Sequence, residues 1–585
     1  MLSLIPLSAA GLAVAAAFIL ERYRKKRGCE VPGIFLYMTF VLPFAAGGFH
    51  TYISAVTVIC LVLQLTATAK KQGYLRVVLN FNSIAVALVV LGYCITPVWA
   101  ADKGMAVLGI ARYLPIVLYI LVLMQLNPKQ KQHCLDLIPI SGGMMTVLSG
   151  LLLLIPGTAD HLTVSGRLAG FLQYPNTYAA FLLAGLILQY NKEERRKTDI
   201  LVDIILVLGV LLSGSKTGFI LLIASVIGIA TVHKKWNTVL GLTGLFAASV
   251  LLALFLSNFD SLQYAGRFRN IRITSESFLL RLLYYKDALP MILKNPFGYG
   301  YMGYRALQGT FQNGRYYVTY IHNGFLQLLF EIGWIPALAM AIAFLRAILS
   351  RKTAPGSRLL LCVLLAHCML DFDLQFFVFW TILLAGLDFE GGTQWKLRTK
   401  VGGTVFASVC VILCLWLGTV DFCYSIGETD ISLQLLPQHT DSLSVKLRKT
   451  SDLDTLNETA DRILEVNPTF SLAYSAKANY ALSQGDVLSM MAYKEQAIRC
   501  SRYTAEEYMD YFDKLYAVAR LYQQNGDDQS AEYCLRKIVY LSEMMKAVQN
   551  TTEPLTKEIG AYTILKLPIK YRMYMRMLTD RYYQQ

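Results

Sequence analysis

Long apolar stretches separated by short polar loops dominate the first 420 residues of the chain. A helix needs about 20 consecutive apolar residues to cross a bilayer, and most of these stretches approach or reach that length. We therefore predict an all-α polytopic membrane bundle of about 14 spans over residues 1–420. The expected spans lie near 4–20, 31–48, 52–69, 77–98, 105–126, 135–156, 169–190, 199–213, 217–232, 237–256, 324–349, 358–371, 374–388 and 401–420.

The pattern changes after Val420. The composition of residues 421–585 is that of a soluble domain of about 165 residues, and its repeat-like segments predict that it is α-helical. Two segments resemble tetratricopeptide helix pairs, with turns at Gly485-Asp486 and Gly526-Asp527; these turns lie 41 residues apart, so an insertion in the usual repeat is required. Such a domain commonly binds a protein partner on its concave face. A helical domain that serves packing alone is the alternative.

The composition supports a membrane protein. Hydrophobic residues make up 55% of the 585 residues, charged residues make up 16%, and the mean hydropathy is +0.45, which excludes an ordinary soluble domain. The net charge of +15 arises in part from basic loops between apolar spans, as the positive-inside rule expects, and no nucleic-acid partner is expected. The eleven cysteines form no Cys-x-x-Cys pair, so we expect no disulfide framework, no metal and no other cofactor.

Positive charge alternates along the loops and predicts the topology. The basic loops contain 22–27, 70–71, 129–131, 193–197, 234–235, 351–352 and 396–400, whereas the loops between them carry little positive charge. With the basic loops in the cytoplasm of a bacterial cell, the first helix is a retained span and the 421–585 domain lies outside the cytoplasmic membrane.

The long outer loop at 257–320 departs from this rule. It carries eight basic residues and three acidic ones. Loops longer than about 60 residues can escape the charge rule, which is one explanation. The other is an anion site, because guanidinium groups match phosphate oxygens. The basic residues are Arg267, Arg269, Arg272, Arg281, Lys286, Lys294, Arg305 and Arg315.

A histidine follows this loop at the predicted mouth of a membrane span. His322-Asn323 leads into the apolar stretch 324–349, which predicts one long helix. Gly333 follows His322 by eleven residues and is expected about 20° from its face, whereas Glu331 is expected on the opposite face. A helix-cap histidine that bonds to water is the alternative to a functional role for His322.

Other charged positions are expected at the same membrane face. Arg167 precedes Pro175-Asn176, which interrupts a span where irregular backbone usually lines a cavity. Lys216 lies in a turn between two short spans and is either functional or a plain loop lysine. Arg112 lies inside the fifth span, where a charge needs a cavity or a partner, and pairing with Glu331 would explain it equally well.

A last polar group occurs at 367–373. His367 and Asp371 are four residues apart and would share a helix face, with Asp373 just beyond. A metal site would need a further ligand, so orientation of the structure or acceptor binding is the preferred role.

These residues carry a resemblance to a known family. His322-Asn323, followed after nine residues by Gly333, resembles the signature of the O-antigen ligase and polysaccharide polymerase superfamily, although Pro336 replaces its last glycine. Arg167 with Pro175-Asn176 is similar to that family's arginine and Pro-Asn motif, and 367–373 resembles an element of related Gram-positive proteins. The outer-loop pattern is similar at Arg281, Asp287-Ala288, Pro296, Gly298 and Gly300.

The resemblance implies a GT-C-like membrane glycosyltransferase that takes glycan from an undecaprenyl-pyrophosphate-linked donor. Cations aimed at the leaving pyrophosphate would stabilise its growing charge without a metal, and an imidazole, with an ordinary pKa of about 6.5, can accept a proton from an acceptor hydroxyl. Direct attack implies an inverting reaction. The expected catalytic residues are His322 and Arg281; the expected pyrophosphate ligands are Arg167, Lys216, Arg281 and Arg112; acceptor or structural roles are expected for Asn323, Asn176, His367, Asp371 and Asp373.

Elongation of a surface polysaccharide is the first functional hypothesis. Transfer of finished glycan to another polymer or to a protein is the second. A flippase for lipid-linked oligosaccharide would also have many helices, but its charges would be expected near the bilayer midplane. A non-enzymatic receptor with a tetratricopeptide ectodomain is a further hypothesis, but it would not explain a histidine motif beside an arginine-rich loop.

Overall fold

The computed structural model describes residues 4–25, 33–192, 195–234, 276–398 and 401–583, with the single positions 241, 244 and 247. Internal contacts divide the chain into two compact units. The first unit contains Met1–Ile95, Val107–Arg272 and His322–Gly427, and the second contains Thr96–Ala106, Ile273–Ile321 and Glu428–Gln585. The expected span at 237–256 lies outside the described residues, apart from those three single positions.

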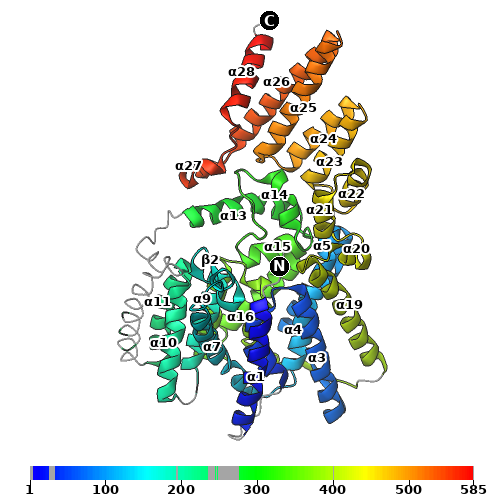
Figure 1. The fold of residues 1–585 in the computed structure, drawn as a ribbon. Coiled ribbons are helices and arrows are strands. Elements are labelled where there is room, and N and C mark those ends of the chain that lie inside the picture. The colour runs from blue at the N-terminus through cyan, green and yellow to red at the C-terminus, as the bar shows by residue number, and fades with distance from the viewer. Residues whose placement is uncertain are drawn as a thin grey trace. The chain divides into compact units, whose positions relative to one another are not determined.

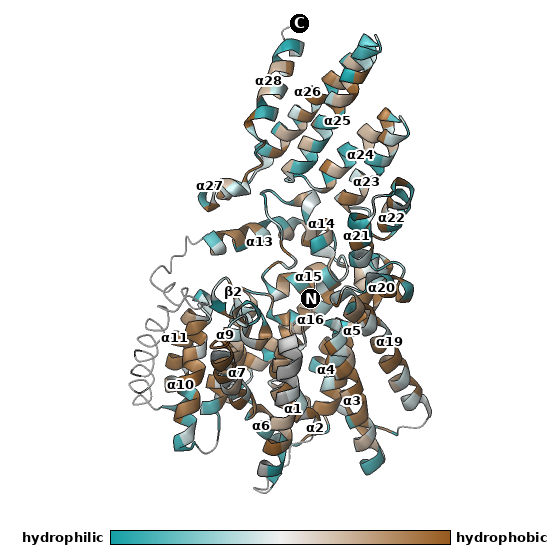
Figure 2. Ribbon diagram, viewed as in Figure 1, coloured by the Kyte–Doolittle hydropathy of each residue, from teal (hydrophilic) through white to brown (hydrophobic). Residues whose placement is uncertain are grey.

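The first unit is an apolar helical bundle, and the predicted all-α membrane fold is confirmed (Figure 1). Among the described residues, six helices are long and apolar enough to cross a membrane, and hydrophobic residues follow one another along much of the helical ribbon (Figure 2). Its helices are α1 (Leu4–Lys25), α2 (Gly33–Leu36), α3 (Thr51–Gln72), α4 (Phe81–Ile95), α5 (Lys103–Leu123, beginning in the second unit), α6 (Pro128–Leu135), α7 (Ile138–Leu152), α8 (Ala159–Leu162), α9 (Pro175–Tyr190), α10 (Lys197–Leu212), α11 (Lys216–His233), α15 (Gly324–Ile332), α16 (Trp334–Leu349), α17 (Pro355–Cys368), α18 (Phe377–Ala385) and α19 (Val401–Ser425).

Helix α9 is the central helix of one half of this bundle. Residues 175–189 are all buried, and the helix packs against α7, α10, α11 and α17. Gly218 allows α11 to approach α9 closely, because a Cβ at that position would lie 2.8 Å from the Cβ of Ala179. The first turns of α9 and α11 are therefore held near each other.

Two small antiparallel pairs of strands complete the first unit. Strand β1 (Leu75–Leu79) pairs with β4 (Thr393–Leu397), with Leu75 opposite Leu397. Strand β2 (Thr163–Val164) pairs with β3 (Arg167–Leu168), with Val164 opposite Arg167. The turn between β2 and β3 has positive φ at Ser165 and Gly166, the geometry of a two-residue hairpin.

The predicted continuous helix at 324–349 is wrong. Gly333, with φ 82° and ψ −176°, separates α15 from α16, and glycine adopts this conformation at little cost. Pro336 fits in the first turn of α16, where its missing N–H is tolerated. The faces predicted for Gly333 and Glu331 were also wrong, because His322 precedes the helix and has φ 58°.

The predicted regular span at 31–48 is also replaced by shorter pieces. The short helix α2 is followed by a π-helical turn, η1 (Tyr37–Val41), and by the 3-10 turns η2 (Leu42–Phe44) and η3 (Ala46–Gly48). Pro43 interrupts the helical hydrogen bonding, and Gly47 has φ 61°. Hydropathy therefore located the buried segment but missed its irregular backbone.

The second unit is helical and more polar. Gly485 and Gly526 have φ of 75° and 77° at the turns that join α23 to α24 and α25 to α26, and Asp486 and Asp527 cap the helices that follow. The tetratricopeptide assignment itself stays a prediction. The unit contains η4 (Thr96–Val98), α13 (Glu276–Lys294), α14 (Gly303–Phe311), α20 (Thr429–Leu435), α21 (Thr440–Lys449), α22 (Leu453–Val466), α23 (Ser471–Ser483), α24 (Val487–Cys500), α25 (Ala505–Gln524), α26 (Asp528–Thr551), α27 (Leu555–Ile559), η8 (Ala561–Thr563) and α28 (Ile569–Tyr583).

Buried carboxylates join distant segments of the second unit. Asp102 accepts hydrogen bonds from Thr440 Oγ1 at 2.6 Å and from Asn467 Nδ2 at 3.0 Å. Asp287 accepts from the backbone N–H of Asn313 at 2.9 Å, from Asn313 Nδ2 at 2.8 Å and from the Tyr316 hydroxyl at 2.9 Å. Burial raises the pKa of both carboxyl groups above its ordinary value, and the hydrogen bonds oppose that shift.

Candidate active site

His322 lies directly before helix α15 in a strained conformation. Its φ of 58° is in the left-handed region, which a non-glycine residue rarely occupies. The side chain of Asn323 caps α15, because its Oδ1 accepts from the N–H groups of Phe325 and Leu326, both at 3.0 Å. Backbone strain of this kind is often stored at functional positions. The cap therefore fixes the point from which the imidazole projects.

The imidazole pairs with a buried carboxylate. His322 Nδ1 lies 3.2 Å from Asp371 Oδ1, and the side chains are 20% and 2% exposed. Since a carboxylate accepts, Nδ1 carries the proton in this contact and Nε2 carries the lone pair of the neutral ring. Phe372 packs edge-on against the imidazole, with ring centroids 5.1 Å apart. These contacts hold the ring in the tautomer that a general base requires.

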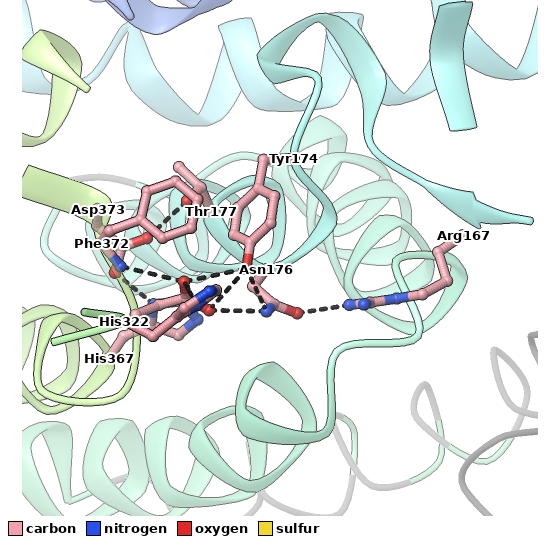
Figure 3. Close-up of polar contacts among 9 residues, drawn as sticks. Arg167, Tyr174, Asn176, Thr177, His322, His367, Phe372 and Asp373 are labelled. Atoms are coloured by element: carbon pink, nitrogen blue, oxygen red, sulfur yellow. Dashed lines mark hydrogen bonds and ion pairs between the residues drawn. The ribbon is translucent and has the colours of Figure 1, made fainter. Parts of the chain in front are cut away.

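The carboxylate is held in turn by the beginning of α9. Asn176 Nδ2 donates to Asp371 Oδ2 at 2.7 Å, and the Tyr174 hydroxyl donates to Oδ1 at 3.1 Å. Arg167 donates through Nη2 to Asn176 Oδ1. Figure 3 shows the resulting line of polar contacts, with Arg167 and His322 toward opposite ends. The structure thus joins the imidazole and a guanidinium through one amide and one carboxylate.

His367 and Asp373 form a neighbouring buried pair. His367 Nδ1 lies 2.5 Å from Asp373 Oδ2, and Thr177 donates to Asp373 Oδ1 at 2.7 Å. The predicted shared helix face of His367 and Asp371 was wrong, because α17 ends at Cys368 and Asp371 lies beyond it. The chain turns after α17, so that Asp371 reaches His322 and Asp373 turns to His367. Both carboxylates are thereby tied to α9, one through Asn176 and one through Thr177.

Lys216 belongs to a turn whose backbone accepts a hydrogen bond from Arg167. Lys216 is the first residue of α11, and Ser215 caps this helix by accepting from the N–H of Gly218 at 3.1 Å. Arg167 Nε donates to the Ser213 carbonyl at 2.9 Å. The 213–216 turn therefore brings together a guanidinium, an ammonium-bearing residue and the positive end of an 18-residue helix, which favours an anion.

Arg112 is buried inside the bundle. Its side chain donates to the carbonyls of Phe49 and Gln375, the latter at 2.8 Å, and its guanidinium carbon lies 4.9 Å from the centroid of the Phe49 ring. These contacts fix the segment that follows Asp373. Pyrophosphate binding by Arg112 stays a prediction from the sequence.

Arg281 belongs to the second unit. It is half-buried in α13, one turn before Tyr284. Burial raises the pKa of Tyr284 to about 12, and the charge of Arg281 opposes that shift. Its predicted catalytic role rests on the sequence.

The sequence interpretation missed Tyr174, Thr177 and Phe372. Tyr174 and Thr177 flank Pro175-Asn176, and a proline at the first position of a helix marks the turn where side chains beside it point out of the helix end. Phe372 lies between the two acidic residues of the 371–373 segment. These neighbours of the predicted polar residues would have been the natural candidates for supporting contacts.

Part of the chain is similar to a known protein family. Residues 201–342 match a family model described as O-antigen ligase. No curated protein and no solved structure gives a significant match. The matched segment includes Lys216, Arg281, His322 and Asn323. This match supports the resemblance to the O-antigen ligase and polysaccharide polymerase superfamily that the motifs at Arg281 and His322-Asn323 carry.

Proposed function

We propose that this protein polymerises a bacterial surface polysaccharide by transferring glycan from an undecaprenyl-pyrophosphate-linked donor on the outer face of the cytoplasmic membrane. The observation that carries this proposal is the pairing of His322 with Asp371, joined through Asn176 to Arg167. This arrangement provides a base on one side and a cation on the other, the two groups that transfer from a pyrophosphate carrier needs.

His322 acts as the general base. Its Nε2 accepts the proton of an acceptor hydroxyl as that oxygen forms a bond to the anomeric carbon of the donor glycan. The bond from this carbon to the pyrophosphate oxygen breaks, and its electron pair leaves with the lipid pyrophosphate. Because the attack is direct, the anomeric configuration inverts. Asp371 stabilises the imidazolium that forms, as a carboxylate behind a catalytic imidazole does.

The leaving pyrophosphate is stabilised by fixed cations. Arg167 donates to the backbone of the 213–216 turn, Lys216 is part of that turn, and the N-terminus of α11 adds a helix dipole at the same place. Each preorganised donor aimed at a developing charge is commonly worth about 2.7–4 kcal/mol. Arg281 stays a pyrophosphate ligand predicted from the sequence alone. This charge stabilisation is sufficient in kind for a reaction without a divalent metal.

The second unit is proposed to lie outside the cytoplasm, on the side where transfer occurs. Within the superfamily, polymerisation adds donor glycan to a growing chain, whereas ligation delivers finished glycan to a different acceptor. We assign polymerisation first, and ligation to a polymer or protein is the alternative.

The decisive experiment supplies the purified protein with a synthetic undecaprenyl-pyrophosphate oligosaccharide as the sole substrate. A ladder of products supports polymerisation, whereas reaction only after addition of a separate acceptor supports ligation. His322→Ala should abolish product in either case, and His133→Ala in α6 provides a matched control that should retain it. Normal turnover by His322→Ala would remove the histidine from the chemistry.

A further inference from the structure

A large cavity lies within the second unit, apart from the candidate active site of the first unit. Its volume is about 970 Å³, near the upper end of the range of about 300–1,000 Å³ that small-molecule sites occupy. One wall comes from 280–317, which belongs to the segment that matches the O-antigen ligase family. The other walls come from the C-terminal helices, from 441–507 and from Tyr562. Residues of the family-matched segment and residues of the C-terminal helices, all in the second unit, thus line one cavity together.

Tyrosine rings form a rigid part of its lining. Tyr284 and Tyr316 pack at 4.6 Å between ring centroids, and the Tyr316 hydroxyl donates to the buried carboxylate of Asp287 at 2.9 Å. The Tyr503 hydroxyl lies 2.8 Å from Thr552 Oγ1. Tyr317 differs, because it lines the cavity with 76% of its side chain exposed. Aromatic groups that are already fixed bind a ligand with little loss of conformational entropy.

Two charged groups of the lining, Arg305 and Glu507, are already paired inside the protein. Arg305 forms two hydrogen bonds to Asp441, at 3.1 and 2.7 Å. Glu507 accepts from Ser471 and Ser475 and pairs with Lys494. These carboxylates retain lone pairs that can accept from hydroxyl groups, but they do not present a strong single-sign field. The cavity therefore favours a neutral ligand rich in hydroxyl groups over a strongly charged one.

We propose that this cavity binds several sugar units of the glycan on which the enzyme acts. Pyranose rings present C–H groups on a face that packs against tyrosine rings, while their hydroxyl groups bond to polar side chains. If the C-terminal helices bound a peptide, there would be no reason for the family-matched segment to contribute tyrosines to the cavity wall. This inference rests on the proposed function for the identity of the glycan, but binding can be measured without transfer.

The test uses the full-length protein in detergent and two probes. The first is a fluorescently labelled oligosaccharide released by partial hydrolysis of the host cell's own surface polysaccharide, and the second is the synthetic lipid-linked donor. Tyr317→Ala should weaken binding of at least one probe by about five- to tenfold, because it removes an exposed aromatic face. Tyr317→Phe should bind like the parent, since the ring is kept.

Tyr533→Ala provides the matched control. Tyr533 lies in α26 of the same unit with 47% exposure, away from the cavity lining, so its loss should leave both dissociation constants unchanged. Competition between the probes separates the two sources of glycan. Displacement of the free oligosaccharide by the donor indicates that the cavity receives donor sugars, and simultaneous binding of both indicates that it receives the acceptor chain.

The inference and the proposed mechanism can fail separately. His322→Ala should bind both probes normally while transferring nothing. Normal transfer by that variant would refute the role of His322 as general base but would leave the glycan site in the cavity unaffected. Unchanged affinity of Tyr317→Ala for both probes would overturn the glycan site. A change in the protein's intrinsic fluorescence with a tryptic peptide mixture, but with neither glycan probe, would also overturn it in favour of a peptide site.

Discussion

Asp371→Asn tests how the imidazole is activated. The substitution keeps the size of the side chain but removes the negative charge that lies 3.2 Å from His322 Nδ1. A hydrogen bond to a charged group contributes about 1.5–3 kcal/mol. If that interaction grows as His322 becomes an imidazolium, its loss lowers kcat by about 10- to 150-fold, since 1.36 kcal/mol corresponds to a factor of ten.

The effect should fall on kcat rather than on KM. Asp371 is 2% exposed behind the imidazole, so the substrate does not need to contact it. Most of the fold around it should survive, because the amide oxygen of the variant can still accept from Asn176 Nδ2. The assay is a rate measurement with a fluorescent lipid-linked oligosaccharide in detergent, together with a thermal unfolding curve for each variant.

Asp203→Asn provides the matched control for removing a buried carboxylate from the first unit. Asp203 is 2% exposed in α10 and pairs with Arg195, so its loss should lower stability without a selective fall in kcat. Retention of the parent kcat by Asp371→Asn, or an equal fall in both variants that follows their loss of stability, would refute the role of Asp371.

Three further predictions test the charges and the topology. Arg281→Lys should lose much of the transfer activity that Arg281→Ala loses, because an ammonium lacks the planar fork of a guanidinium. Near-parent turnover would indicate that the 257–320 loop supplies only a diffuse positive field. A cysteine at exposed Tyr317 should react with an impermeant maleimide in intact cells and one at exposed Ala354 should not, relative to the parent background, and the reverse labelling would invert the topology. Burial raises the pKa of Asp287 above its ordinary 3.8, so its contribution to stability is present at low pH and is lost as pH rises through the folded-state pKa. The Tm of the parent should therefore fall more between pH 4 and 7 than the Tm of Asp287→Asn. Parallel curves of Tm against pH would contradict this.

Hydropathy was sufficient to predict the helical membrane fold, because a bilayer requires long apolar helices whatever their packing. It did not predict the break at Gly333, since the whole stretch 324–349 is apolar and only the backbone at one glycine separates two helices. Nor did it predict the π-helical and 3-10 turns at 37–48, because hydropathy reports burial and not the hydrogen-bonding pattern of the backbone.

The polar residues of the candidate site were predictable individually but not as partners. His322, Asn176 and Asp371 were all singled out, yet the sequence paired Asp371 with His367 through helical spacing. That spacing fails because α17 ends at Cys368. The actual contacts join positions 49 and 195 residues apart, and such distances depend on how helices pack. The link through Asn176 to Arg167 therefore required the structure.

The interleaved segments of the second unit have a consequence for biosynthesis. Asp102 bonds to residues that follow it by 338 and 365 positions, so these partners are made long after it. At about 5–20 residues per second, the ribosome needs about 17–70 s to add the first of them. During that time the Asp102 carboxylate waits without these partners while the intervening membrane helices are inserted, and the 276–321 segment waits for its C-terminal neighbours from its own synthesis onward. A chain that ends before Thr440 would keep this segment permanently immature, so removal of the C-terminal helices would arrest assembly instead of deleting an independent module.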